Sequence, residues 1–112
     1  MAARKIQFQV NSAILTKASY EVLDQVARLM MENTDFRLSI EGHTSSDGKY
    51  EANMTLSAQR ADAVRKYLIA HGVRPESRVT SVGLGSNKPL NQGRTAAERA
   101  KNRRVELIVS NQ

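Results

Sequence analysis

Two segments with helical periodicity constrain the fold of this chain more than any other feature. In residues 17–31 apolar side chains recur every three or four positions, with charged side chains between them. The same period returns over residues 49–71. The buried stripe predicted for this second segment consists of Ala52, Leu56, Ala61, Val64 and Leu68. Each helix therefore needs another layer of structure to cover its apolar face.

Short segments with strand periodicity alternate with these helices. Residues 6–10 and 36–41 alternate apolar and polar side chains, which predicts two half-buried strands. Val79 and Ser81, followed by a turn at residues 83–85, indicate a short third strand. Residues 104–109 are predicted to form the last strand.

The remaining segments complete the order of elements. Gly72 fits a left-handed cap at the end of the second helix, and Pro75 prevents its continuation. A loop over residues 86–93 precedes a short basic helix over residues 95–101. Strand, helix, strand, helix, strand, short helix, strand predicts an α/β (α+β) two-layer sandwich. Two main helices and a short third would cover a mixed four-stranded sheet.

Composition limits the class of protein and of partner. The 112 residues predict one domain, residues 1–112, and the absence of cysteine excludes disulfides and thiolate metal sites. The net charge is +6 and uneven. Residues 1–56 hold six Lys/Arg against seven Asp/Glu, whereas residues 57–112 hold eleven against four. Such asymmetry favours an anionic partner, such as cell-wall polymer, lipid headgroups or nucleic acid.

A set of motifs identifies a family. It comprises Gly42-His43-Thr44, Gly48, Asn53, Leu56-Ser57-Ala58-Gln59-Arg60-Ala61 and Asn102-Arg103-Arg104-Val105. This set resembles the OmpA-like C-terminal peptidoglycan-binding domain of outer-membrane porins, peptidoglycan-associated lipoproteins and flagellar stator proteins. The resemblance covers nearly the whole chain. One departure is that Ser45 stands where the family has an aspartate after Gly-His-Thr.

The resemblance implies a pocket for the side-chain end of diaminopimelate, which carries an ammonium and a carboxylate. Arg60 matches the arginine that binds the carboxylate, a task suited to the fixed fork of a guanidinium. Ser45 offers the ammonium a dipole instead of a charge. Asp47 has two open interpretations: it supplies the missing carboxylate, or it only forms a turn with Gly48.

Further positions match the lining of the family's pocket or the residues that hold its loops. They are Asn11, Thr44, Asn53 and Leu56. Gln9 falls where many relatives carry an acidic residue. Strand alternation predicts that only one of Arg103 and Arg104 approaches the pocket, and we expect it to be Arg103.

Other signals in the sequence have simpler structural explanations. His43 is expected to be structural, with a hydrogen bond at the end of its strand, and Arg65 to be solvated. His71 is expected to cap the second helix as a cation. No catalytic constellation, metal site or cofactor site is predicted.

The resemblance implies a non-enzymatic periplasmic domain that binds diaminopimelate-containing peptidoglycan and tethers the outer membrane to the wall. The segment Met1–Arg4 lacks the apolar core of a signal peptide. We therefore expect a domain excised from a larger protein, whose barrel or lipid anchor would provide the only membrane contact. One alternative is an OmpA-like scaffold domain with weak or lost wall binding. A nucleic-acid binder is disfavoured by the few stacking aromatic residues.

Overall fold

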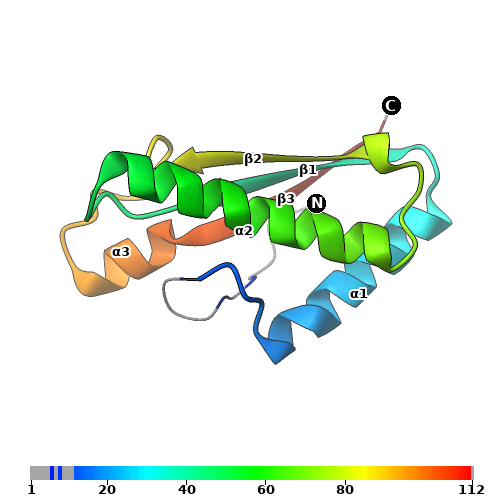
Figure 1. The fold of residues 1–112 in the computed structure, drawn as a ribbon, viewed down its shortest axis with the longest axis horizontal. Coiled ribbons are helices and arrows are strands. Elements are labelled where there is room, and N and C mark those ends of the chain that lie inside the picture. The colour runs from blue at the N-terminus through cyan, green and yellow to red at the C-terminus, as the bar shows by residue number, and fades with distance from the viewer. Residues whose placement is uncertain (1–5, 7, 9–11, 112) are drawn as a thin grey trace.

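The computed structural model describes Ile6, Phe8 and residues 12–111. Its elements are α1 (Lys17–Glu32), β1 (Phe36–His43), α2 (Tyr50–Ala70), the 3-10 helix η1 (Glu76–Arg78), β2 (Val79–Gly85), α3 (Ala96–Asn102) and β3 (Arg104–Asn111). The strand order is β2-β1-β3, with β1 parallel to β2 and antiparallel to β3. The mixed sheet, its helices and the predicted fold class are confirmed (Figure 1).

The predicted first strand, residues 6–10, lies mostly outside the described residues. Within the description, Phe8 forms an isolated antiparallel bridge with Leu15. The described part of the sheet therefore has three strands, and β1 is its central one.

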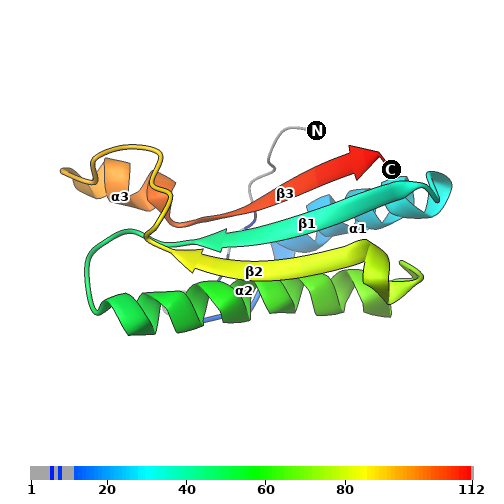
Figure 2. The ribbon, with the colours of Figure 1, turned by 90° about the horizontal axis from the view of Figure 1, so that it is seen from above.

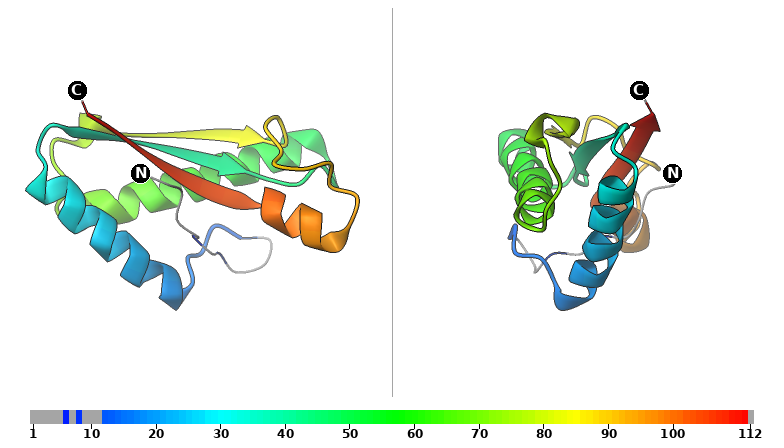
Figure 3. Two further views of the ribbon diagram at one scale, coloured as in Figure 1. Left: turned by 180° about the vertical axis from the view of Figure 1, so that it is seen from behind. Right: turned by 90° about the vertical axis from the view of Figure 1, so that its right-hand side faces the viewer.

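The core lies between the two long helices and one face of the sheet. In the end-on view of Figure 3, α1 and α2 lie next to each other with the sheet beside them. Strand alternation directs Leu38 and Ile40 of β1 into this layer, where both are at most 1% exposed. They pack with buried side chains of α1, α2 and β3, among them Leu23, Met30, Val64, Leu68 and Leu107. Each such side chain contributes about 1.5–3 kcal/mol by leaving water.

The first half of α2 lies directly on strand backbone, because glycines face it. A Cβ added at Gly42 would lie 2.1 Å from the Ser57 carbonyl oxygen, and one added at Gly83 would lie 2.4 Å from the Ala58 nitrogen. The prediction of a turn at residues 83–85 is therefore wrong, because these residues continue β2 to provide this contact.

The predicted buried stripe of α2 is correct for only three of its five positions. Ala61, Val64 and Leu68 are fully buried, but Ala52 is exposed and Leu56 is half-buried. Since small residues already occupy the contact between the first half of α2 and the sheet, the Ala52 and Leu56 side chains face elsewhere.

The end of α2 has the predicted left-handed cap. Gly72 has a φ of 107°. The Gly72 N–H donates to the Ile69 carbonyl at 3.1 Å, and the Val73 N–H donates to the Leu68 carbonyl at 3.2 Å, which is the Schellman pattern. His71 Nδ1 lies 2.8 Å from the Tyr67 carbonyl oxygen, so its side chain also satisfies the last turn.

Two arginines that the sequence analysis did not assign to structure bind backbone carbonyls. Arg78 is 7% exposed, and its guanidinium donates to four carbonyls from three segments of the chain. Arg65 donates from Nε to the Val79 carbonyl at 2.8 Å and from Nη2 to the Glu76 carbonyl at 3.2 Å. Arg65 is therefore not simply solvated, because it joins α2 to the start of β2.

Loops and the short helix α3 surround the other end of the sheet, remote from Arg78. Figure 2 shows that the C-terminal ends of β1 and β2, the loop from β1 to α2, and α3 all gather there. The crevice beyond the strand ends is where ligands commonly bind in α/β folds. Among the described residues, no helix is long and apolar enough to span a bilayer.

Candidate functional site

A groove of about 1410 Å³ lies at this end of the molecule. Its walls come from the loop between β1 and α2, the first half of α2, the segment before α1, and the region from α3 into β3. All the predicted site residues within the description line it. They are Thr44, Ser45, Asp47, Asn53, Leu56, Arg60 and Arg103. The remaining one, Asn11, lies outside the described residues, as does Gln9.

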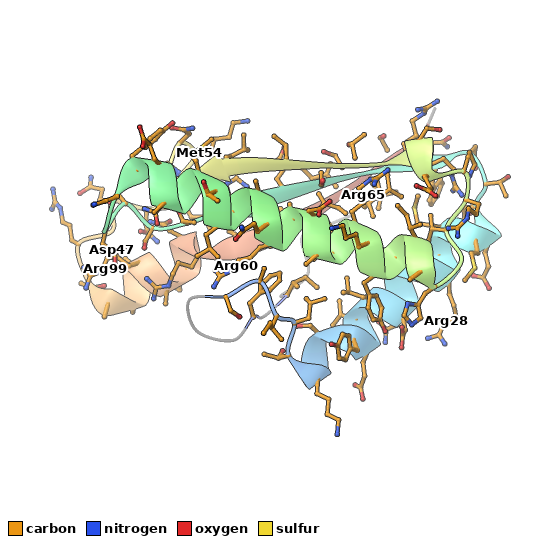
Figure 4. The ribbon with its side chains drawn as sticks, viewed as in Figure 1. Arg28, Asp47, Met54, Arg60, Arg65 and Arg99 are labelled. Atoms are coloured by element: carbon orange, nitrogen blue, oxygen red, sulfur yellow. The ribbon has the colours of Figure 1, made fainter. Side chains whose placement is uncertain are left out.

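Arg60 is a partly buried cation on the α2 wall. In Figure 4 its side chain leaves α2 toward the segment before α1, on the opposite side of the helix from Arg65. Arg60 Nε donates to the Ser12 carbonyl at 2.8 Å, and the guanidinium carbon lies 5.1 Å from the centre of the Phe8 ring. These contacts orient the guanidinium without neutralising it.

No carboxylate within the described residues forms an ion pair with Arg60. The residues outside the description have no acidic side chains. Burial, and secondarily the charge of Arg103, lowers the pKa of Arg60. A guanidinium that is partly desolvated beside a second cation and lacks a counterion can stabilise a bound anion.

Ser45 connects two charged groups on the other side of the groove. Its side chain is buried, and its hydroxyl donates to the Asp47 carboxylate. The same hydroxyl oxygen accepts from Arg103 Nη1 at 3.2 Å. The Ser45 hydrogen bond is the main cause that lowers the pKa of Asp47, with smaller contributions from Arg103 and Arg99. The groove thus contains an ionised carboxylate two residues after the position that lacks one.

Asn53 fixes the loop that carries Ser45 and Asp47. Its Nδ2 donates to the Ser45 carbonyl at 3.2 Å and to the Asp47 carbonyl at 3.0 Å. Gly48 has a φ of 87°, so the predicted turn after Asp47 is also present. The two interpretations of Asp47 are therefore compatible: it forms the turn, and it lines the groove.

Thr44 supplies a buried polar atom at the base of the groove. It is 3% exposed, and its Oγ1 has no hydrogen-bond partner within the described residues. Its backbone N–H donates to the Gly85 carbonyl at 2.8 Å, which holds the residue at the end of β1. A buried hydroxyl without a partner is costly, and a ligand atom could satisfy it.

Both Arg103 and Arg104 line the groove, so the expectation that only one would approach it is wrong. The alternation argument fails because Arg103 is the C-cap of α3 and precedes the strand. Arg104 nevertheless has a structural role. Its guanidinium contacts Glu106 at 2.5 Å, the Lys88 carbonyl at 3.0 Å and the Asn102 carbonyl at 3.3 Å.

The ring of His43 is buried but, contrary to the prediction, neither ring nitrogen has a hydrogen-bond partner among the described residues. Its Nε2 lies 3.4 Å from a Glu41 oxygen and 3.8 Å from a Glu106 oxygen. Burial, and then the charge of Arg104, lowers the pKa of His43. Glu41, His43 and Glu106 are the described residues that could hold a metal ion, but Arg104 already neutralises Glu106.

Sequence reasoning missed part of the groove lining. Ala52 was expected in the core, Phe8 was expected within a half-buried strand, and Leu90 and Lys101 received no role, yet all four line the groove. Leu90 is 61% exposed and belongs to none of the family motifs, so only the structure places it in the groove lining. These residues give the groove apolar and basic walls beyond the motif positions.

Comparison with known proteins assigns the family. The OmpA family model matches residues 7–103, so the chain belongs to the OmpA family. It is 43% identical over 105 residues to the peptidoglycan-binding protein ArfA of Mycobacterium tuberculosis, and 39% identical over 105 residues to the probable lipoprotein YiaD of Escherichia coli. Each match covers 94% of this chain, but only 32% of ArfA and 48% of YiaD.

A solved structure supports the same assignment. The peptidoglycan-associated lipoprotein of Burkholderia pseudomallei superimposes with a TM-score of 0.85 at 29% identity, covering 98% of this chain and 91% of that one. The chain therefore has the OmpA-like fold. It spans about a third to a half of the length of the curated relatives named above.

Proposed function

We propose that this domain binds peptidoglycan non-covalently by capturing the diaminopimelate end of the stem peptide. Arg60 binds the carboxylate through the part of its fork that Ser12 does not occupy. Asp47 binds the ammonium, in place of the family aspartate that Ser45 replaces. The proposed action is binding without a catalytic step.

The observation that carries this proposal is the pairing of opposite unmatched charges in one groove. Arg60 is a partly buried cation without an acidic partner in the described chain, and Asp47 is a carboxylate whose pKa is lowered by the hydrogen bond from Ser45. A zwitterionic ligand matches both. Relatives whose names include peptidoglycan binding or association support the choice of polymer.

The cellular setting follows from the same relatives. The lipoproteins among them favour the periplasmic side of the outer membrane, where this domain would tether the membrane to the wall. A larger parent protein would supply the membrane anchor.

Retention on insoluble peptidoglycan, with and without free diaminopimelate as competitor, tests the proposal. We expect the domain to sediment with the polymer and to be released by the competitor. Failure to sediment would favour the alternative, an OmpA-like scaffold domain that has lost wall binding. Sedimentation that the competitor does not reverse would contradict the assignment of diaminopimelate as the ligand.

A further inference from the structure

The groove carries more positive charge than a zwitterion can balance. Its basic lining residues are Lys49, Arg60, Lys101, Arg103 and Arg104, whereas Asp47 and Glu106 are its acidic ones. Arg104 and Glu106 pair with each other. The described lining therefore keeps four cations against one carboxylate. A ligand of zero net charge would leave this excess unchanged, whereas a net anion would offset it.

Arg103 is the cation best placed to bind a second anionic group. It stands on a different wall from Arg60, at the end of α3, and its side chain is exposed. One nitrogen, Nη1, donates to Ser45. No other hydrogen bond or ion pair of its guanidinium occurs among the described residues. The rest of the fork is therefore free to donate to a ligand.

The size of the groove supports a ligand longer than one amino acid. Its volume of about 1410 Å³ exceeds the range of about 300–1,000 Å³ that is usual for pockets holding small ligands. Thr44 adds an unpartnered buried hydroxyl to the same surface, which is a second donor for a polar ligand. The exposed Leu90 adds an apolar wall beyond the motif residues.

We propose that the groove recognises two free carboxylates of the stem peptide and thereby discriminates against its amidated forms. Arg60 takes the carboxylate at the end of diaminopimelate, and Arg103 takes the α-carboxylate of the D-glutamate that precedes it in the stem. Amidation converts either carboxylate into a neutral group that no longer forms a charge-assisted bidentate contact. This inference rests on the proposed function and adds the second subsite and its selectivity.

Three synthetic ligands test it: the N-acetylated stem tetrapeptide, the same peptide amidated at the D-glutamate α-carboxyl, and the same peptide amidated at the free diaminopimelate carboxyl. Titration calorimetry with the wild-type domain should show each amide binding about tenfold more weakly than the acid, the effect of losing one charged hydrogen-bonded contact. In Arg103→Gln the loss of affinity caused by amidating the D-glutamate should disappear, and the loss caused by amidating diaminopimelate should remain. In Arg60→Gln the reverse is expected.

Arg99→Gln is the matched control, because it removes the same charge from the same helix. Arg99 contacts the Gly93 carbonyl at 3.3 Å and is not part of the groove lining. It should keep both amidation penalties. Arg103→Lys retains the charge without the fork, and it should lose most of the glutamate-amide penalty while preserving the melting temperature.

The outcomes separate this inference from the proposed function. If the tetrapeptide binds but both amides bind equally well, the two-carboxylate model is wrong while peptidoglycan binding stands. If Arg99→Gln and Arg103→Gln reduce the penalties alike, net charge rather than a subsite is responsible, and the assignment of Arg103 is wrong. If no tetrapeptide binds to a folded wild-type domain, the proposed function itself fails.

Discussion

Arg78 and Arg60 show how the two ends of this molecule use the same side chain for opposite purposes. Arg78, at the end remote from the groove, donates to the carbonyls of Phe36, Arg74, Met30 and Asn33 at 2.7–2.9 Å. Arg60 donates to one carbonyl, that of Ser12, and otherwise faces the groove. The first guanidinium is satisfied by backbone, and the second has donors left for a ligand.

The difference follows from what surrounds each residue. Arg78 reaches carbonyls at the C-terminal end of α1 and just beyond it, where helix carbonyls lack partners and carry negative partial charge. Arg60 lies at mid-helix in α2, where the backbone is already paired. A buried arginine with a full set of carbonyls therefore stabilises the fold, whereas one facing a groove is available for binding.

The largest expected effect is on stability, at Arg78. Arg78→Ala leaves several backbone carbonyls buried without a donor, at about 1–3 kcal/mol for each group that water does not reach. We expect the free energy of unfolding to fall by at least about 3 kcal/mol, measured by urea denaturation. Arg78→Lys should recover little, because an ammonium cannot reproduce the fork. An unchanged urea midpoint for Arg78→Ala would refute the structural role.

The next effect concerns binding at the groove end. Asp47→Asn should weaken binding of diaminopimelate at least tenfold, or by about 1.4 kcal/mol, because the ammonium loses the carboxylate of the described groove lining that is not paired with an arginine. Ser45→Asp in the same background should restore binding. Asp62→Asn, which removes a carboxylate paired with Lys66 on the surface of α2, is the control and should bind normally. Normal binding by Asp47→Asn would contradict the ammonium-binding role of Asp47 and leave it only its role in the turn.

A smaller effect is expected from pH, again at the groove end. The pKa of His43 lies below its ordinary value of 6.5, so the unfolded chain binds this proton more readily than the folded domain. Neutral His43 therefore contributes its full stabilisation above pH 6.5, the pKa of the unfolded chain. This stabilisation is lost as the pH falls through the lower pKa of His43 in the folded domain. Unfolding free energies measured from about pH 7.5 to about pH 5.5 should decline, and His43→Gln should flatten the decline. An identical slope in that variant would exclude His43 as its source.

Sequence patterns predicted correctly those features that depend on interactions between residues close together in the sequence. The periodicity of residues 17–31 and the Gly72 cap depend on neighbours within a few residues, and both predictions are confirmed. Position in a groove is not local. Leu56 has the spacing of a core residue but lines the groove. Glycines of β1 and β2 bring Ser57 and Ala58 of α2 onto the sheet, so Leu56 does not face the core. These strands are distant from each other in the sequence, and the helical pattern carries no information about them.

The two arginines illustrate the same limit. Arg60 was selected through a family motif, since an arginine on a helix surface has no distinguishing pattern of its own. Arg78 has no motif, and three of its four carbonyl partners lie 42 or more residues away along the chain. Only the tertiary structure brings them together. The roles of the groove residues in ligand binding stay predictions until they are measured.

The most direct test of the account compares Arg60→Ala with Arg65→Ala in a titration with the stem tetrapeptide. Both changes remove an arginine from α2, but Arg65 contacts only backbone carbonyls away from the groove. We predict that Arg60→Ala weakens binding by about 1.5–3 kcal/mol with its fold intact, while Arg65→Ala loses some stability and binds normally. Wild-type affinity in a folded Arg60→Ala domain would contradict the claim that this groove captures a carboxylate through Arg60.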